Sequence, residues 1–463
     1  MQKWNKQFLP GRRGFLKSLI LGATGLTLAT AASKSAPILA AQLRGSLDGS
    51  SLGIIPGALD DQSTLIQNAI DTARARGKPL FLPAGRYAVS NLKFQSGTQI
   101  VGVPGQTHLV YSGDGHMILS ENTEQIRIEG IVIDGSNRKL AGYAPALLSF
   151  TNVSDCILEN CQIVGSSKVG IQLLRSSGRI HHCDIFGAAD VAVYAIESKN
   201  LSITDNIIRQ AGNGGILVHR WTAGPDGTII TGNRIENIKS VSGGTGQHGN
   251  GINVFRAHGT IISGNLISDC VFSAIRVNSC DNTQIANNTV KRLGEVAIFS
   301  EFSFSGSVIT GNIVDTAAGG ISMANFNEGG HLAVCSNNIV RNIVGNSAVP
   351  IENTLYGTGI GAEADTTLIG NVVENCALDG IALGWGPYLR DVTAVGNTIR
   401  KCRNGIAVTV VEGSGAAVIT SNIITKSREH AISGFRWYEK VTGDLTVSDS
   451  QNFKHLTIQN NHT

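Results

Sequence analysis

The sequence predicts an all-β protein, a single-stranded right-handed parallel β-helix with an α-helix that caps its N-terminal end. Two observations predict this fold. Two residue landmarks recur along the chain with nearly constant spacing inside a unit and variable spacing between units, as in a solenoid whose loops leave at particular corners. The segments at these landmarks are short, rich in β-branched residues and alternate with period two, which is typical of strands.

Composition excludes several other classes of protein. The 463 residues are 42% apolar and 15% charged, with 56 glycines and 10 prolines. The glycines follow no triplet, which excludes collagen, and the abundant Ile, Val and Leu exclude intrinsic disorder. Six of the 37 basic residues lie in residues 1–41, which leaves 31 basic residues against 34 acidic ones in the remainder. This near-neutral balance predicts no nucleic-acid partner.

Residues 1–41 are predicted to be an export signal. Arg12 and Arg13 precede a weakly apolar run over residues 18–32, and the signal ends on small residues that suit cleavage near Ala41. The stretch resembles a twin-arginine signal, with Gly11 where the usual pattern has Ser or Thr. The resemblance implies the twin-arginine translocation machinery as a partner and a periplasmic or secreted mature protein without a stable membrane anchor. A Sec signal peptide or a lipid-facing anchor segment is the alternative.

Residues 42–110 are predicted to form an N-terminal cap and the first strands. Residues 60–63 include side chains that can cap the N-terminus of a helix. An apolar stripe that includes Ile66 and Ile70 then predicts one short amphipathic helix that ends before Gly77. Short strands and a turn follow. This arrangement resembles the N-terminal cap of pectate-lyase-like and phage-tailspike β-helices, in which a helix covers the open end of the coils.

Residues 111–463 are predicted to be the coils of the β-helix, each with three short strands in about 22 to 26 residues. The first landmark is an asparagine, found at Asn206, Asn233, Asn265, Asn288, Asn312, Asn338, Asn371, Asn397 and Asn422. The second is an Ile or Val that follows a Gly or Ala, found at Ile171, Val193, Ile216, Ile252, Ile275, Ile298, Ile321, Ile360, Ile381, Ile406 and Ile432.

The landmark asparagines are predicted to line an inward corner, where each amide hydrogen-bonds the next in a dry interior. Cys161 and Cys183 occupy the same landmark in two earlier coils, and Cys270, Cys376 and Cys402 each lie five residues after a landmark asparagine. These cysteines are predicted to be stacked core thiols. No Cys-x-x-Cys pair occurs, so no metal site is predicted from them.

The export signal, the capping helix and the repeated coils together resemble the bacterial twin-arginine-exported β-helix repeat proteins of the pectate-lyase-like (pectin-lyase-like) superfamily. The resemblance covers most of the chain after residue 41. It implies polysaccharide chemistry, although this family has no settled activity and fold alone is a weak warrant for function.

Strand alternation predicts that the residues one and three positions after each landmark Ile or Val point outward. Polar and ionisable residues gather at these positions in the middle coils, whereas the C-terminal coils carry mainly small and uncharged residues there. We therefore predict a site that runs from the third to the eighth coil. The predicted catalytic residues are His219, Arg256, Arg276 and Glu301. The predicted substrate-binding residues are Arg220, Trp221, Asn253, Asn278, Glu363, Trp385, Tyr388 and His248.

Two tryptophans lie in insertions on one rim of this predicted face. Trp221 and Trp385 are expected either to stack on sugar rings or to pin their own loops. A Gly-rich insertion over residues 241–250 carries His248 and leaves from the opposite edge of the same strand, where it is expected to form a wall or lid.

Three chemistries fit these residues. Elimination or C5 epimerisation at a uronic acid needs a cation or amide at the sugar carboxylate, from Arg276 or its neighbours, and a base such as His219. An inverting glycoside hydrolase would use Glu301 and Glu363, two coils and roughly 10 Å apart. A non-catalytic glycan-binding or envelope-scaffold protein needs only the groove. We favour elimination or C5 epimerisation, with an acidic polysaccharide as the partner. No metal-ligating residues are predicted, and Ca²⁺ is the one cofactor that this chemistry could use.

Overall fold

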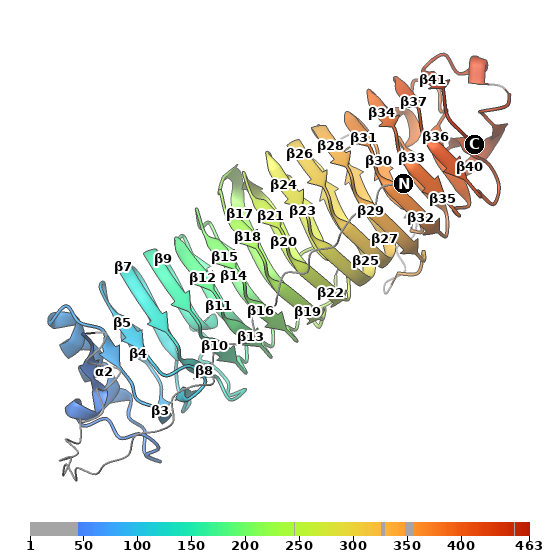
Figure 1. Cartoon of the computed structure of the whole chain (residues 1–463). Helices are drawn as coiled ribbons and strands as arrows, with labels where there is room; N and C mark the ends of the chain where they lie inside the picture. Colours follow the sequence, from blue (N-terminus) through green and yellow to red (C-terminus); the bar gives the residue numbers. More distant parts are fainter. Residues whose placement is uncertain (1–44, 245, 326–328, 348–355, 449) are drawn as a thin grey trace, which may run out of the picture. The chain divides into compact units, whose positions relative to one another are not determined.

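The computed structural model describes residues 45–244, 246–325, 329–347, 356–448 and 450–463. The predicted export signal, residues 1–41, lies outside the described residues. The described chain forms three parallel sheets, here called A, B and C, because each coil adds one strand to each sheet in turn. Figure 1 shows the strands of successive coils side by side, from the blue coils beside helix α2 to the red coils at the C-terminal end.

The elements of each sheet follow one another in chain order. Sheet A contains β3 (Gly85–Val89), β6 (Thr107–Tyr111), β8 (Val132–Asp134), β10 (Gln162–Val164), β13 (Asp184–Phe186), β16 (Ile207–Arg209), β19 (Arg234–Ile238), β22 (Leu266–Cys270), β29 (Ile339–Ile343), β32 (Val372–Cys376), β35 (Thr398–Arg400) and β38 (Ile423–Thr425). Sheet B contains β4 (Leu92–Phe94), β11 (Val169–Leu174), β14 (Val191–Ile196), β17 (Gly214–Pro225), β20 (Asn250–His258), β23 (Ile275–Asn278), β30 (Ile360–Ala362), β33 (Asp379–Leu383), β36 (Asn404–Thr409) and β39 (Ile432–Arg436). Sheet C contains β1 (Leu47–Asp48), β2 (Leu80–Phe81), β5 (Gln99–Val101), β12 (Gly178–His181), β15 (Ser202–Thr204), β18 (Ile229–Thr231), β21 (Ile261–Ser263), β24 (Thr283–Ala286), β26 (Ser305–Thr310), β28 (His331–Ser336), β31 (Thr366–Ile369), β34 (Val392–Val395), β37 (Ala417–Thr420) and β41 (Leu456–Gln459).

Four long strands turn a corner and pair in two sheets. They are β7 (Ile118–Glu129), β9 (Ala146–Glu159), β25 (Thr289–Glu301) and β27 (Ile313–Ala324). Strand β40 (Glu439–Asp444) pairs antiparallel with β39 in a hairpin, whereas the other strand pairs of the described chain are parallel. The predicted all-β parallel solenoid is therefore confirmed.

The strand register follows the predicted landmarks. Ile252 pairs with Ile275, Ile275 with Ile298, and Ile298 with Ile321, and the same register holds from Ile171 to Ile432. These side chains are buried in one continuous apolar core. A slip of one residue would turn each of them outward, so their burial sets the register.

Helix α2 (Ser63–Ala75) covers the first coils, beside the short 3-10 turn η1 (Gly49–Leu52). It buries Ile66, Ala69, Ile70 and Ala73, the stripe that the sequence predicts. Asp61 supports its start, because a carboxylate oxygen accepts a hydrogen bond from the Ser63 N–H at 2.8 Å.

The landmark asparagines form a continuous ladder between sheets C and A. In each rung the backbone N–H and the side-chain Nδ2 of one asparagine both donate to Oδ1 of the next, as from Asn265 to Asn288 at 2.9 and 3.0 Å. Nδ2 also donates to a backbone carbonyl, that of Ile262 in the case of Asn288. The ladder runs from Asn206 to Asn422 and ends on Asn461, which the repeat pattern did not predict.

The eight cysteines of the described chain are free thiols, and all are buried. Cys183 lies directly below the ladder, since its N–H donates to Oδ1 of Asn206 at 2.9 Å. Cys161 and Cys183 hydrogen-bond each other, as do Cys376 and Cys402. The prediction of stacked core thiols is confirmed.

Candidate functional site

The outward face of sheet B carries two columns of side chains in register. Asn253 pairs with Arg276 in the first column, and Phe255 with Asn278 in the second. The predicted outward residues therefore do share one face, with neighbouring coils about 4.8 Å apart. Their roles depend on the partners that each side chain meets.

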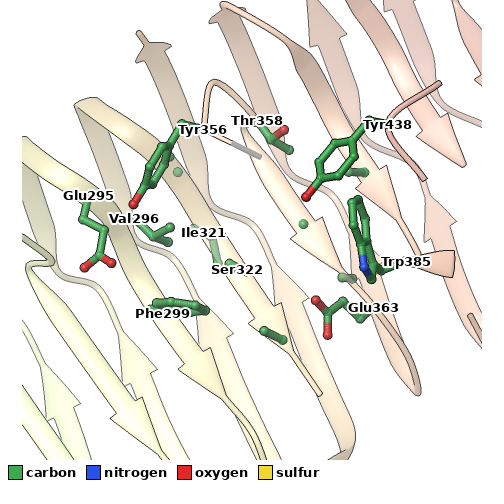
Figure 2. A pocket seen from close by; sticks show the side chains of 17 residues that line it. Glu295, Val296, Phe299, Ile321, Ser322, Tyr356, Thr358, Glu363, Trp385 and Tyr438 are labelled. Atoms are coloured by element: carbon green, nitrogen blue, oxygen red, sulfur yellow. The ribbon is translucent and has the colours of Figure 1, made fainter. Parts of the chain in front are cut away.

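A groove of two adjoining cavities, with volumes of about 550 and 180 Å³, lies over this face at its C-terminal end. It spans the coils from β25 to β39, five steps or about 24 Å. The larger cavity has the volume of a small-molecule site, for which about 300–1,000 Å³ is usual. Figure 2 shows Glu295 and Glu363 on opposite sides of this cavity, with Trp385 and Tyr438 along one wall.

Small residues make the floor of the groove. Gly361, Ala382, Gly384 and Ala407 hold the outward positions in three successive coils, so nothing fills the space above the strands. The C-terminal coils thus carry the small outward residues that the sequence predicts, and a groove lies over them. Their lack of large side chains is what hollows the surface.

Three aromatic side chains form the C-terminal wall. The Trp385 ring contacts Trp437 at 5.5 Å and Tyr438 at 4.7 Å between ring centroids, both edge to face. Trp437 and Tyr438 come from the tight turn that joins β39 to β40. A Cβ atom on Gly386 would lie 2.4 Å from the Trp437 ring, so only glycine allows this close approach.

Glu295 lines the opposite end of the larger cavity and is nearly fully buried. One carboxylate oxygen accepts a hydrogen bond from the Ser273 hydroxyl at 3.2 Å and lies 3.4 Å from Nη1 of Arg276. Burial raises the pKa of Glu295 above its usual value, while the positive charge of Arg276 opposes that rise. Figure 2 shows Val296, Phe299 and Tyr356 on the same side of the cavity as Glu295.

Arg276, predicted to be catalytic, is a buried ion-pair centre. Its Nε and Nη2 donate to the two carboxylate oxygens of Glu301 at 2.8 and 2.9 Å, and its guanidinium lies 4.9 Å from the centre of the Phe299 ring. Asn278 donates to the same carboxylate at 2.7 Å. Arg276 is 9% exposed and Glu301 2%, so the ion pair is buried.

His219 uses both ring nitrogens within the protein. Nε2 lies 2.8 Å from Oδ1 of Asn253, and Nδ1 lies 3.3 Å from the Tyr194 hydroxyl. The Asn253 amide donates in turn to the carbonyl of Gly246, which leaves its oxygen to accept from Nε2–H. Burial lowers the pKa of His219 to about 4, so the ring is neutral near pH 7.

Arg220 and Trp221 lie in β17 and Arg256 lies in β20, and both arginines contact the preceding coil. Arg220 is buried and donates to Glu197 at 3.1 Å. Arg256 donates to the Trp221 carbonyl at 2.7 Å and lies over the Phe255 ring. Trp221 is 62% exposed and lies six coils before Trp385, so these two tryptophans do not meet in one site.

Three other predicted residues lie at separate places. Glu363 lines the larger cavity and accepts a hydrogen bond from the Asn325 N–H at 2.7 Å. Tyr388 ends the 3-10 turn η2 (Gly386–Tyr388) and lines neither cavity. His248 lies before β20, where Nδ1 contacts the Gly243 carbonyl at 2.8 Å.

The predicted residues thus separate into two groups. Those around β17 to β25 hydrogen-bond mostly to one another, whereas Glu363 and Trp385 line the groove. The residues that sequence reasoning missed are Glu295, Tyr356, Thr358, Trp437 and Tyr438. A usable signal was present, because glycine and alanine fill the outward positions of consecutive coils and an aromatic pair follows the last strand of sheet B.

Neither a metal centre nor a membrane span is found within the described residues. No group of three or more His, Cys, Asp or Glu side chains there is arranged to hold a metal ion. No helix there has the length and apolar character needed to cross a bilayer.

The fold and the groove define a class of protein, the parallel β-helix with a ligand-sized groove on one sheet. The chain belongs to the right-handed β-helix family, because the family model described as "Right handed beta helix region" matches residues 85–247 and 223–339. A search of curated proteins finds no match.

Several solved structures are similar to this chain. The surface adhesin PfbA of Streptococcus pneumoniae has 15% identity and a TM-score of 0.45, over 87% of this chain and 95% of that one. The Dettilon tailspike protein has 15% identity and a TM-score of 0.46, over 85% and 69%. The GH87 α-1,3-glucanase of Streptomyces thermodiastaticus has 13% identity and a TM-score of 0.43, over 84% and 66%. None of these likenesses bears on function.

Proposed function

We propose that this protein is an exported glycan-binding β-helix protein that holds a polysaccharide chain along the groove of sheet B. The observation that carries the proposal is the larger cavity, which combines a ligand-sized volume with aromatic walls and carboxylates at opposite sides. Aromatic rings stack on the apolar faces of sugars, and carboxylates accept hydrogen bonds from sugar hydroxyls. The length of the groove suits several sugar units.

Lyase or epimerase chemistry on a uronate polymer has less support from the geometry. Such chemistry needs a cation free to meet the sugar carboxylate and a base free to take a proton. Arg276 already pairs with two carboxylates, and both nitrogens of His219 have partners. Hydrolysis by Glu301 and Glu363 has the same difficulty, because both Glu301 oxygens are bonded to Arg276.

The test is a binding and turnover panel. The purified protein is incubated with neutral, uronate-containing and amine-containing polysaccharides, with and without Ca²⁺. Binding, unsaturated ends, reducing ends and C5 inversion are measured. We expect binding to at least one polymer class without turnover, and Trp385→Ala should weaken it by about tenfold or more.

The matched control is Phe186→Ala, which removes a partly exposed aromatic ring from sheet A and should leave binding unchanged. Unsaturated or inverted products would replace the binding proposal with lyase or epimerase chemistry. Absence of binding to every polymer, or binding that survives Trp385→Ala, would overturn the proposed site.

A further inference from the structure

We infer that the larger cavity of the groove is a subsite for a sugar that carries a protonated amino group. The inference rests on the proposed function and names its class of ligand. Two features of the cavity lead to it: the sign of its charge and its aromatic faces.

The cavity has an excess of negative charge. Among the described residues, its lining includes Glu295 and Glu363 but no Lys, Arg or His side chain. Arg276, which contacts Glu295 from outside the lining, is shared with Glu301, so one cation serves these two carboxylates. This arrangement would repel a uronate and attract a protonated amine.

Aromatic rings surround the same space. Phe299, Tyr356, Trp385 and Tyr438 all line the cavity, and Figure 2 shows Tyr356 and Tyr438 on either side of it. The faces of aromatic rings attract a cation electrostatically, most strongly where water is displaced. The walls therefore favour a protonated amine as well as the apolar face of the sugar ring.

The experiment compares two oligosaccharides that differ only in their amino groups. Isothermal titration uses a fully deacetylated glucosamine tetramer and the N-acetylated tetramer of the same linkage, beside the polysaccharide panel. We expect the amine form, and amine-bearing polymers generally, to bind at least about tenfold more tightly at low salt, with less preference at high salt because screening weakens the charge contact.

Glu363→Gln keeps an acceptor for the Asn325 N–H and should remove most of this preference. The control is Glu124→Gln, an exposed carboxylate on β7 far from the groove, which should leave the preference unchanged. Equal binding of amine and acetylated forms, or tighter binding of neutral or uronate polymers, would overturn the inference and leave the proposed function standing. Absence of all glycan binding would remove both.

Discussion

Arg276 shows at the residue scale how the chemistry of a side chain depends on its neighbours. Strand alternation correctly places it on the outward face, because period-two geometry is local. Its partners could not be predicted, since Glu295 and Glu301 come from the next coil and their side-chain directions depend on how β25 turns its corner. Arg276 looks available for catalysis in the sequence, but in the structure its guanidinium is already paired with carboxylates of the protein.

The buried ion pair should be costly to break. Glu301→Ala removes both short ion-pair contacts of the buried Arg276, and we expect a loss of about 3–5 kcal/mol in the free energy of unfolding, measured by urea denaturation. The exposed pair Arg292–Asp269 is the comparison, because Asp269→Ala should cost only about 0–1 kcal/mol. Equal losses in the two variants would show that the Arg276 network is solvated.

His219 should make stability depend on pH. Burial lowers its pKa from 6.5 to about 4, so between these values the unfolded chain binds more protons than the folded one. The contribution of His219 is therefore complete above about pH 6.5 and is lost as the pH falls towards 4.

The measurement compares the urea midpoint of the wild type with that of His219→Gln across this pH range. The variant should show a flatter profile, and titration of the His219 ring by NMR should give its low pKa directly. A ring that titrates near 6.5 would contradict the burial described for it.

At the scale of elements, the asparagine ladder follows from the repeat alone. Landmarks that recur with constant spacing must stack in a solenoid, and a buried amide must find a partner. The groove could not be found in the same way. Its hollow comes from small side chains such as Ala382 and Gly384, and its wall comes from the β39–β40 turn, which lies outside the repeat.

The ladder gives a prediction for these elements. Asn288→Leu removes the acceptor for two N–H groups of Asn265 and the donor to Asn312, and we expect a loss of about 1–3 kcal/mol in the free energy of unfolding. Asn461→Leu is the comparison, because this last rung is only half-buried and water can replace the lost bond. If neither variant shifts the urea midpoint appreciably, the asparagine ladder is not shielded from water.

At the scale of the whole molecule, the sequence predicts the register of the coils better than it predicts function. Because the hydrophobic landmarks repeat, the spacing within each coil supports the register predicted for the next one. The register holds from Ile171 to Ile432. A binding groove occurs once and depends on loops whose lengths vary. Repetition therefore helps prediction of the fold and gives no help with the site.

Export also concerns the whole molecule, and substitution of both arginines of the signal tests it. Replacing Arg12 and Arg13 by Lys keeps the charge and changes only the identity of the residues, so we expect folded protein to accumulate in the cytoplasm. Cell fractionation measures the distribution. Unchanged export after the exchange would assign the signal to the Sec route instead.

The asparagine ladder also bears on how such a chain can change over evolution. Each rung presents the preceding coil with the same Oδ1 acceptor, in the same direction, from Asn206 to Asn461. A duplicated or deleted coil would meet an identical neighbour on both sides, so its insertion or loss leaves the hydrogen bonding of the interior intact. Gene duplication could therefore shift the groove along the axis, away from α2, without redesigning either end.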